Sequence, residues 1–155
     1  MLRGCVEPVL APRIRSATLR LLERLGYAVC EAQDEGCCGA LVHHLGRHAQ
    51  ALAAARRNVD AWYPLLEQGL SAIIMTTSGC GTTVKNYGFM LRNDAAYAER
   101  AARVSALARD ISELLQESDL PTVRLQTSVS VAWHAPCSLQ HGQRVTDAPQ
   151  RLLRA

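Results

Sequence analysis

Apolar residues recur with the period of an α-helix in three stretches of the chain. The first follows Pro12 and ends at Gly26, the second runs from about residue 47 to 68, and the third from about residue 94 to 117. In each stretch, apolar side chains return every three or four residues and would cover one helix face. A proline suits the start of a helix and a glycine its end. The pattern predicts three helices, with Pro64 as a point where the second could bend.

Shorter apolar runs typical of strands lie between these helices. They cover residues 27–30, 72–76 and 129–133, and a stub precedes Cys5. Strands that alternate with helices of this length favour an α/β fold, a Rossmann-like parallel sheet flanked by helices. There is little room for a strand before Cys5, and a helix that starts near residue 148 has few residues left. We therefore expect a module truncated at both ends.

The composition of the chain limits its class and its partners. Its 155 residues are 48% hydrophobic and carry a net charge of +3, which predicts one globular domain with a real core. Arginines are scattered and no basic run contains aromatic residues, so we expect no nucleic-acid partner. No apolar stretch approaches a membrane span and no secretory signal is visible, which predicts a cytoplasmic protein. In that reducing compartment, six cysteines indicate metal or redox chemistry.

Five of the six cysteines follow a predicted strand, in the loop that leads to the next helix. They are Cys5, Cys37, Cys38, Cys80 and Cys137. Loops at the carboxyl ends of parallel strands gather at one edge of a sheet, so distant cysteines can converge there. Cys30 falls within a predicted strand instead, and we expect it to be an ordinary core residue.

Glycines flank the cysteines that follow the second and third strands. Gly36 and Gly39 enclose the Cys37-Cys38 pair, and Gly79 and Gly81 enclose Cys80. Glycine lets the backbone come close to a bulky ligand, and a helix start favours thiolate over thiol. Adjacent cysteines suit a cluster of several metal atoms better than a single ion. The sequence therefore predicts a metal site that these glycines support.

Other polar residues give weaker signals. His44 and His48 have the spacing of a helical metal pair, but no acidic partner accompanies them or His43, which favours solvent-facing histidines. Lys85 and Tyr87 lie near Cys80 and could contact the metal site or a partner subunit, but we interpret them as a helix surface. There is no glycine-rich phosphate loop or dinucleotide fingerprint, so we expect no FAD or NAD on this chain.

The residues around the cysteines resemble a known family. The strings that carry the resemblance are Arg3-Gly4-Cys5-Val6-Glu7-Pro8, Glu35-Gly36-Cys37-Cys38-Gly39-Ala40-Leu41, Thr77-Ser78-Gly79-Cys80-Gly81 and Trp133-His134-Ala135-Pro136-Cys137. They are similar to the cysteine-rich CCG domain, which also occurs in the B subunit of heterodisulfide reductase. Within this family, the residues around the cysteines are most similar to those of the iron–sulfur subunits of glycolate-oxidase-type dehydrogenases.

This resemblance implies roles for particular residues and for the whole chain. Cys5, Cys37, Cys38 and Cys80 match the metal ligands of a first CCG module over residues 1–128. Cys137, preceded by a supporting His134, matches the opening of an incomplete second repeat over residues 129–155. The implied function is electron transfer from an FAD-containing dehydrogenase subunit toward a membrane-side acceptor. We expect no glycolate turnover by this chain alone, and membrane contact only through the complex.

The chain also departs from the family pattern, which leaves the metal open. Relatives of the heterodisulfide reductase type end the motif in Cys-x-x-Cys, whereas Gly81, Thr82 and Thr83 follow Cys80 here. Four thiols can hold a [4Fe–4S] cluster, which is the expected cofactor, or a zinc ion. The alternative functions are a structural zinc module at a subunit interface and a thiol–disulfide redox module.

Overall fold

The computed structural model describes residues 1–120 and 129–154. A parallel two-stranded sheet joins β1 (Ile73–Met75) to β2 (Ala108–Asp110), with Ile73 opposite Ala108 and Met75 opposite Asp110. The connection between the strands contains three helices, which are α5 (Ser78–Lys85), α6 (Tyr87–Met90) and α7 (Ala98–Ala106). This β–helix–β unit confirms the predicted α/β class with a parallel sheet.

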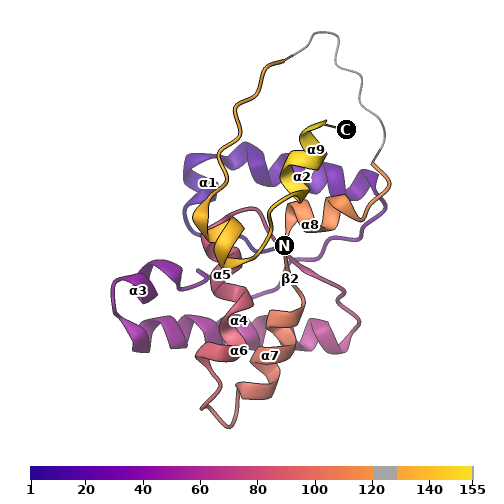
Figure 1. Ribbon diagram of the computed structural model, residues 1–155. Helices are drawn as coiled ribbons and strands as arrows, with labels where there is room; N and C mark the ends of the chain where they lie inside the picture. The colour runs from indigo at the N-terminus through magenta and orange to yellow at the C-terminus, as the bar shows by residue number, and fades with distance from the viewer. Residues whose placement is uncertain (121–128, 155) are drawn as a thin grey trace.

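Helices cover both faces of the small sheet. Ile73 and Met75 pack against α4 (His48–Glu67) and α7, whereas Ile74, which points to the opposite face, packs against Leu22 of α2 (Pro12–Arg24) and Leu114 of α8 (Ile111–Gln116). Figure 1 shows β2 between an upper group of helices with α2 and α8 and a lower group with α4, α6 and α7. The core therefore has a helix–sheet–helix arrangement.

The first two predicted helices are confirmed. α2 begins at Pro12, and Gly26 follows it with a φ of +80°. The Tyr27 N–H donates to the Leu22 carbonyl at 3.0 Å, which closes the helix end in the manner expected of a left-handed glycine. α4 continues through Pro64 to Glu67, so the proline does not end it.

The third predicted helix is wrong as one continuous element. The chain leaves α7 at Ala106, forms β2, and starts α8 at Ile111. Asp110 caps α8, because its carboxylate accepts the Ser112 N–H at 2.9 Å while its own N–H donates to Glu113 at 2.8 Å. This capping box restarts a helix where apolar periodicity alone suggests no interruption.

Two predicted strands are also wrong. Residues 27–30 and 129–133 are described, and neither segment forms a strand. The stub before Cys5 does lie beside the sheet, since the Leu2 N–H donates to the Ile74 carbonyl at 3.0 Å. The polar residues 118–127, with Pro121 among them, are also expected to form a long connection, and most of them fall outside the described residues.

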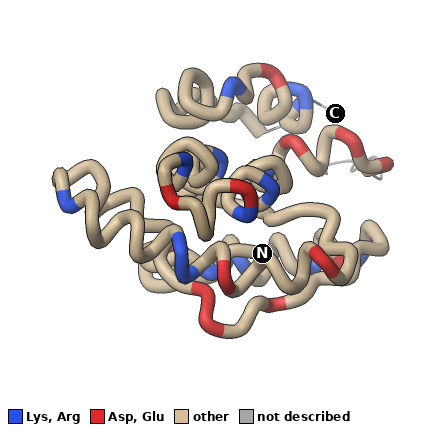
Figure 2. Tube along the Cα trace, turned by 90° about the horizontal axis from the view of Figure 1, so that it is seen from below, with Lys and Arg blue, Asp and Glu red and all other residues tan. Residues whose placement is uncertain are grey.

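Short helices complete the described chain. They are α1 (Glu7–Leu10), α3 (Ala40–His44), the π-helix η1 (Ser138–Gly142) and α9 (Ala148–Arg154), the last of which confirms the helix expected near residue 148. Acidic and basic residues are scattered over the molecule without forming a large patch of one sign (Figure 2). Across residues 1–120 and 129–154, no helix combines the length and the apolar character needed to cross a membrane.

Candidate metal centre

Four cysteines from three separate segments come together at the starts of helices. Cys5 lies in a bend just before α1, Cys37 and Cys38 lie just before α3, and Cys80 lies in the first turn of α5. The short loop between β1 and α5 places Cys80 just beyond the carboxyl end of β1. This is the edge of the sheet where the sequence predicts the site.

The four thiols form two contacting pairs. The sulfur atoms of Cys5 and Cys37 are 3.3 Å apart, and the thiols of Cys38 and Cys80 share a hydrogen bond. The pairs also influence one another, because negative charge on Cys5 or Cys37 raises the pKa of the Cys80 thiol. Cys38 is buried, Cys37 and Cys80 are half-buried, and Cys5 is exposed. The cluster therefore reaches from the core to the surface.

The thiols differ in how readily they ionise. The hydrogen bond from Cys38 lowers the pKa of Cys80, and the same hydrogen bond, together with burial, raises the pKa of Cys38. The hydrogen bond with Cys37, followed by burial, raises the pKa of Cys5. Of Cys5, Cys38 and Cys80, it is therefore Cys80 that most readily gives the thiolate which attacks electrophiles or ligates metals.

The donor chemistry of this group fits an iron–sulfur cluster. All four donors are cysteine sulfurs, which are the usual ligands of iron–sulfur clusters and also of structural zinc. Within the described residues, no three Cys, His, Asp or Glu side chains already surround a common point as they would surround a single ion. The thiols instead meet as two pairs, and ligation requires their protons to leave.

Asn58 of α4 holds the loop that carries Cys37 and Cys38. Its side-chain oxygen accepts the Gly36 N–H at 2.8 Å, and its amide group donates to the Cys37 carbonyl at 3.2 Å. Asn58 is fully buried, and a buried polar group needs such partners. The sequence analysis missed this residue. Its signal is an asparagine between Ala55 and Trp62, on the apolar stripe of a predicted helix.

Tyr87 supports the same loop from α6. Its hydroxyl donates to the Cys38 carbonyl at 2.8 Å and accepts from Asn58 at 3.0 Å. Burial raises the pKa of Tyr87, so the hydroxyl stays protonated and remains a donor. The interpretation of Tyr87 as a helix surface is therefore wrong, because the ring is fully buried. Lys85 is half-buried and pairs with Glu113 at 2.5 Å.

Glu35 joins the loop that carries Cys37 and Cys38 (the CCG loop, residues 35–39) to the segment that carries Cys5. One carboxylate oxygen accepts the Arg3 N–H at 2.8 Å, and the other accepts the Trp62 indole N–H at 2.8 Å. On the far side of Cys5, the Glu7 carboxylate accepts the Thr76 hydroxyl at 2.5 Å. Carboxylates thus tie the Cys5 segment to α4 and to the loop before Cys80.

The flanking glycines have different physical reasons. Gly39 starts α3 with a φ of +84°, and a Cβ there would lie 3.3 Å from the Ala51 carbonyl oxygen. At Gly36 a Cβ would overlap the guanidinium of Arg57. Gly79 faces open space, so sterics alone do not explain it. The fourth glycine, Gly81, lies against Gln143 of the segment that follows η1.

The cysteine expected to open a second set lies outside this cluster. Cys137 is exposed at the start of η1, and His134 is exposed in the segment before it, which forms no helix or strand. Cys30 is exposed, so its expected place in the core is wrong. His44 ends α3 and His48 begins α4, and both are exposed, so they do not share one helix.

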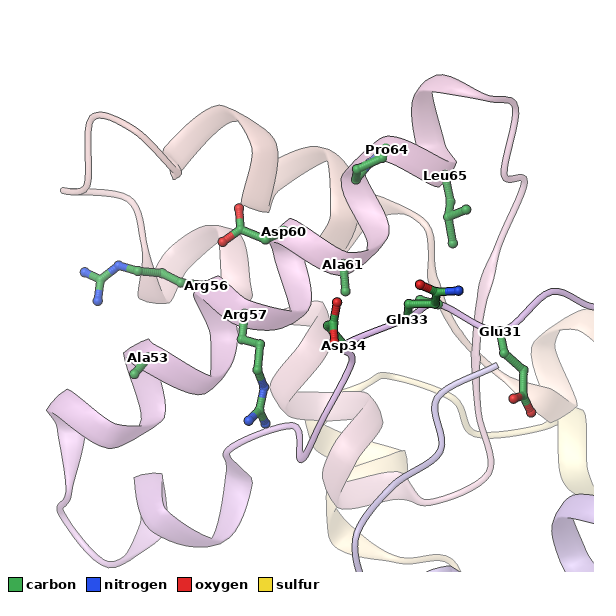
Figure 3. A pocket seen from close by; sticks show the side chains of 11 residues that line it. Glu31, Gln33, Asp34, Ala53, Arg56, Arg57, Asp60, Ala61, Pro64 and Leu65 are labelled. Carbon is green, nitrogen blue, oxygen red and sulfur yellow. The ribbon is translucent and has the colours of Figure 1, made fainter.

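A hollow of about 770 Å³ lies between α4 and residues 31–34, away from the cysteines. Figure 3 shows Arg57 and Asp34 extending into the space between α4 and the loop. It is lined by charged ends and by apolar groups such as Pro64 and Leu65, and contains no cysteine. The cysteine cluster remains the place where the predicted chemistry is concentrated.

Comparisons with known proteins agree with this cluster. Residues 1–85 match the family described as the CCG cysteine-rich domain. The chain is 47% identical over 153 residues to the glycolate oxidase iron-sulfur subunit of Escherichia coli K12. The matched region covers 99% of this chain and 38% of that protein. It is 29% identical to a probable glycolate oxidase iron-sulfur subunit of Bacillus subtilis, covering 98% and 34%. It is 24% identical to lactate utilization protein A of Bacillus licheniformis, covering 97% and 61%.

The chain thus spans between about a third and three-fifths of the length of these relatives. No solved structure matches it. The family match covers more than half of the chain and contains the four clustered cysteines. This chain belongs to the CCG cysteine-rich domain family.

Proposed function

We propose that the chain is an iron–sulfur electron-transfer module of a complex that oxidises a 2-hydroxy acid such as glycolate. The observation that carries the proposal is the meeting of Cys5, Cys37, Cys38 and Cys80 from three segments. These four thiolates would hold one cluster, which we propose is a [4Fe–4S] centre, one of the cluster types that four cysteine thiolates ligate. The iron-sulfur and glycolate oxidase names of the relatives support the same class.

The proposed path of electrons follows from the chemistry of the substrate. Oxidation of a 2-hydroxy acid to a 2-oxo acid releases two electrons and two protons, which an FAD-containing subunit would accept. A bound cluster would supply one-electron transfer between that flavin and a membrane-side acceptor. We propose that residues 129–155 begin a second repeat in which Cys137 and His134 belong to another set.

The residues of this chain hold and shield the centre. Asn58 and Tyr87 fix the carbonyls of the CCG loop from the buried side. Cys5 is exposed and places one ligand at the surface. A centre that lies close to the surface at one side and is held rigidly at the other suits exchange of electrons with a docked partner.

Metal and sulfide content tests this proposal against its alternatives. The natural full-length protein is purified without oxygen, and iron, acid-labile sulfide and zinc are measured for the wild type and for Cys38→Ser. We expect the variant to lose iron and sulfide in equal amounts. Loss of zinc instead would support a structural zinc module and overturn the cluster. An unchanged metal content, with reduction of a disulfide substrate by Cys38 and Cys80, would support the thiol–disulfide alternative.

A further inference from the structure

The π-helix η1 lies across the first turns of α5. The Ser138 and Ser78 hydroxyls are hydrogen-bonded at 2.7 Å, and the Thr82 hydroxyl donates to the Ser138 carbonyl at 2.8 Å. A Cβ on Gly142 would lie 2.8 Å from the Thr82 side chain. The two elements are therefore in close contact, and the region around Cys137 rests on the helix that carries Cys80.

Gln143 closes this contact directly beside Cys80. Its side chain is buried, and its amide group donates to the Ser78 carbonyl at 2.9 Å. The same amide lies against Gly81, where a Cβ would come within 2.4 Å of its nitrogen and 2.8 Å of its oxygen. Gln143 thus contacts the residue two positions before Cys80 and the residue immediately after it.

The side-chain oxygen of Gln143 shows which contacts set the orientation of the amide. Among the described residues it has no hydrogen-bond partner, although it is buried. Leaving such an oxygen unpaired costs free energy, so solvation does not explain why the amide is turned this way. The orientation is explained by the donated hydrogen bond to Ser78 and by the close fit over Gly81.

We propose that Gln143 is a positioning residue that fixes the α5 turn carrying Cys80. A ligand of the first cysteine set would then be held in place by the segment that begins the second repeat, so that the two cysteine-bearing regions are mechanically coupled. This inference rests on the proposed role of Cys80 as a metal ligand. It also predicts an effect on the Cys80 thiol when no metal is bound.

The first test replaces the amide in the natural full-length protein, purified without oxygen. Gln143→Leu removes the hydrogen bond and keeps most of the volume. Gln140→Leu, on the adjoining π-helix η1, is the matched control. In metal-free protein we expect alkylation of Cys80 to become about fivefold faster in Gln143→Leu, as expected from the loss of one hydrogen bond. In loaded protein we expect a changed EPR line shape at unchanged iron content. Equal behaviour of the two variants would overturn the proposal.

The second test is a double-mutant cycle, which separates positioning of Cys80 by Gln143 from general destabilisation. Gly81→Ala should push the Gln143 amide away, because the new Cβ overlaps it. We expect Gly81→Ala to speed Cys80 alkylation in the wild-type background and to have little further effect in the Gln143→Ser background, which provides room. An equal effect in both backgrounds would contradict the proposal. If the protein binds no metal, the proposed function fails, while the alkylation rates still decide the role of Gln143.

Discussion

Asn58 donates a hydrogen bond of 3.0 Å to the hydroxyl of Tyr87, and both residues are completely buried. Together they satisfy the backbone behind the paired cysteines, since Asn58 binds Gly36 and Cys37 while Tyr87 binds the Cys38 carbonyl. A fully satisfied buried network fixes one geometry. The loop is therefore held by side chains that do not themselves ligate.

Replacing Asn58 tests this support directly. In Asn58→Leu, the half-buried Gly36 N–H and Cys37 carbonyl and the buried Tyr87 hydroxyl lose a partner, so we expect the free energy of unfolding to fall by about 3 kcal/mol. Urea denaturation of the metal-free protein measures the change. Asn93→Leu changes an exposed asparagine and is the matched control. A loss no greater than that of the control would show that the network is not needed.

The Tyr87 hydroxyl gives a prediction with a pH dependence. Burial raises its pKa in the folded state, so the stabilisation is complete below about pH 10, the unfolded value, and is lost as the pH rises above it. We expect wild type to be more stable than Tyr87→Phe at neutral pH. This advantage should shrink by about 1.4 kcal/mol per pH unit above pH 10. Denaturation curves at pH 8 and pH 11 measure it, and a constant difference would be contrary to burial of the hydroxyl.

Glu35 should contribute much more than its neighbour Glu31. In Glu35→Ala, the Trp62 indole N–H and the Arg3 N–H lose a charged acceptor, and we expect a loss of about 2 kcal/mol of unfolding free energy. Glu31 is exposed and pairs with Arg3 and Arg15 at the surface, so Glu31→Ala should have little effect. Thermal unfolding followed by tryptophan fluorescence compares the two, and equal shifts in Tm would contradict the assignment.

The glycines of the CCG loop should not respond alike to alanine. Gly39→Ala puts a Cβ on a residue with left-handed backbone dihedrals and brings it close to Ala51. We expect it to lower the free energy of unfolding by about 1–2 kcal/mol. Gly36→Ala meets only the movable end of Arg57, and Gly79→Ala meets open space. We expect both to cost less than Gly39→Ala in the same denaturation assay. A different ranking would mean that the backbone path at Gly39 is not the constraint.

The sequence predicted the features that arise locally. Pro12 and Gly26 mark the ends of α2, and the apolar stripe through Val59 and Trp62 predicts α4. Cysteines between glycines predict the loops that meet. The segment around Ala108 could not be assigned this way, because its residues suit a helix and only pairing with β1 makes it a strand. The Asp110–Glu113 capping box was the local sign of that break.

The support of the site depends on contacts between distant positions. Asn58 and Tyr87 are separated by 29 residues, and Gln143 and Ser78 by 65. Apolar periodicity places Asn58 on the buried face of α4, but it does not say which backbone group the side chain meets. Cys30 shows the opposite error, because a short apolar run suggests a buried strand, whereas residues 27–30 form no strand and Cys30 is exposed.

The central claim is that Cys5, Cys37, Cys38 and Cys80 hold one iron–sulfur cluster, and the most direct measurement is iron per chain in cysteine-to-serine variants. The natural full-length protein is purified without oxygen as wild type, Cys38→Ser and Cys30→Ser. We predict that Cys38→Ser lacks the iron of one cluster and that Cys30→Ser, which changes an exposed cysteine outside the set, retains all of it. Full iron in Cys38→Ser, or an equal loss in Cys30→Ser, would contradict the account.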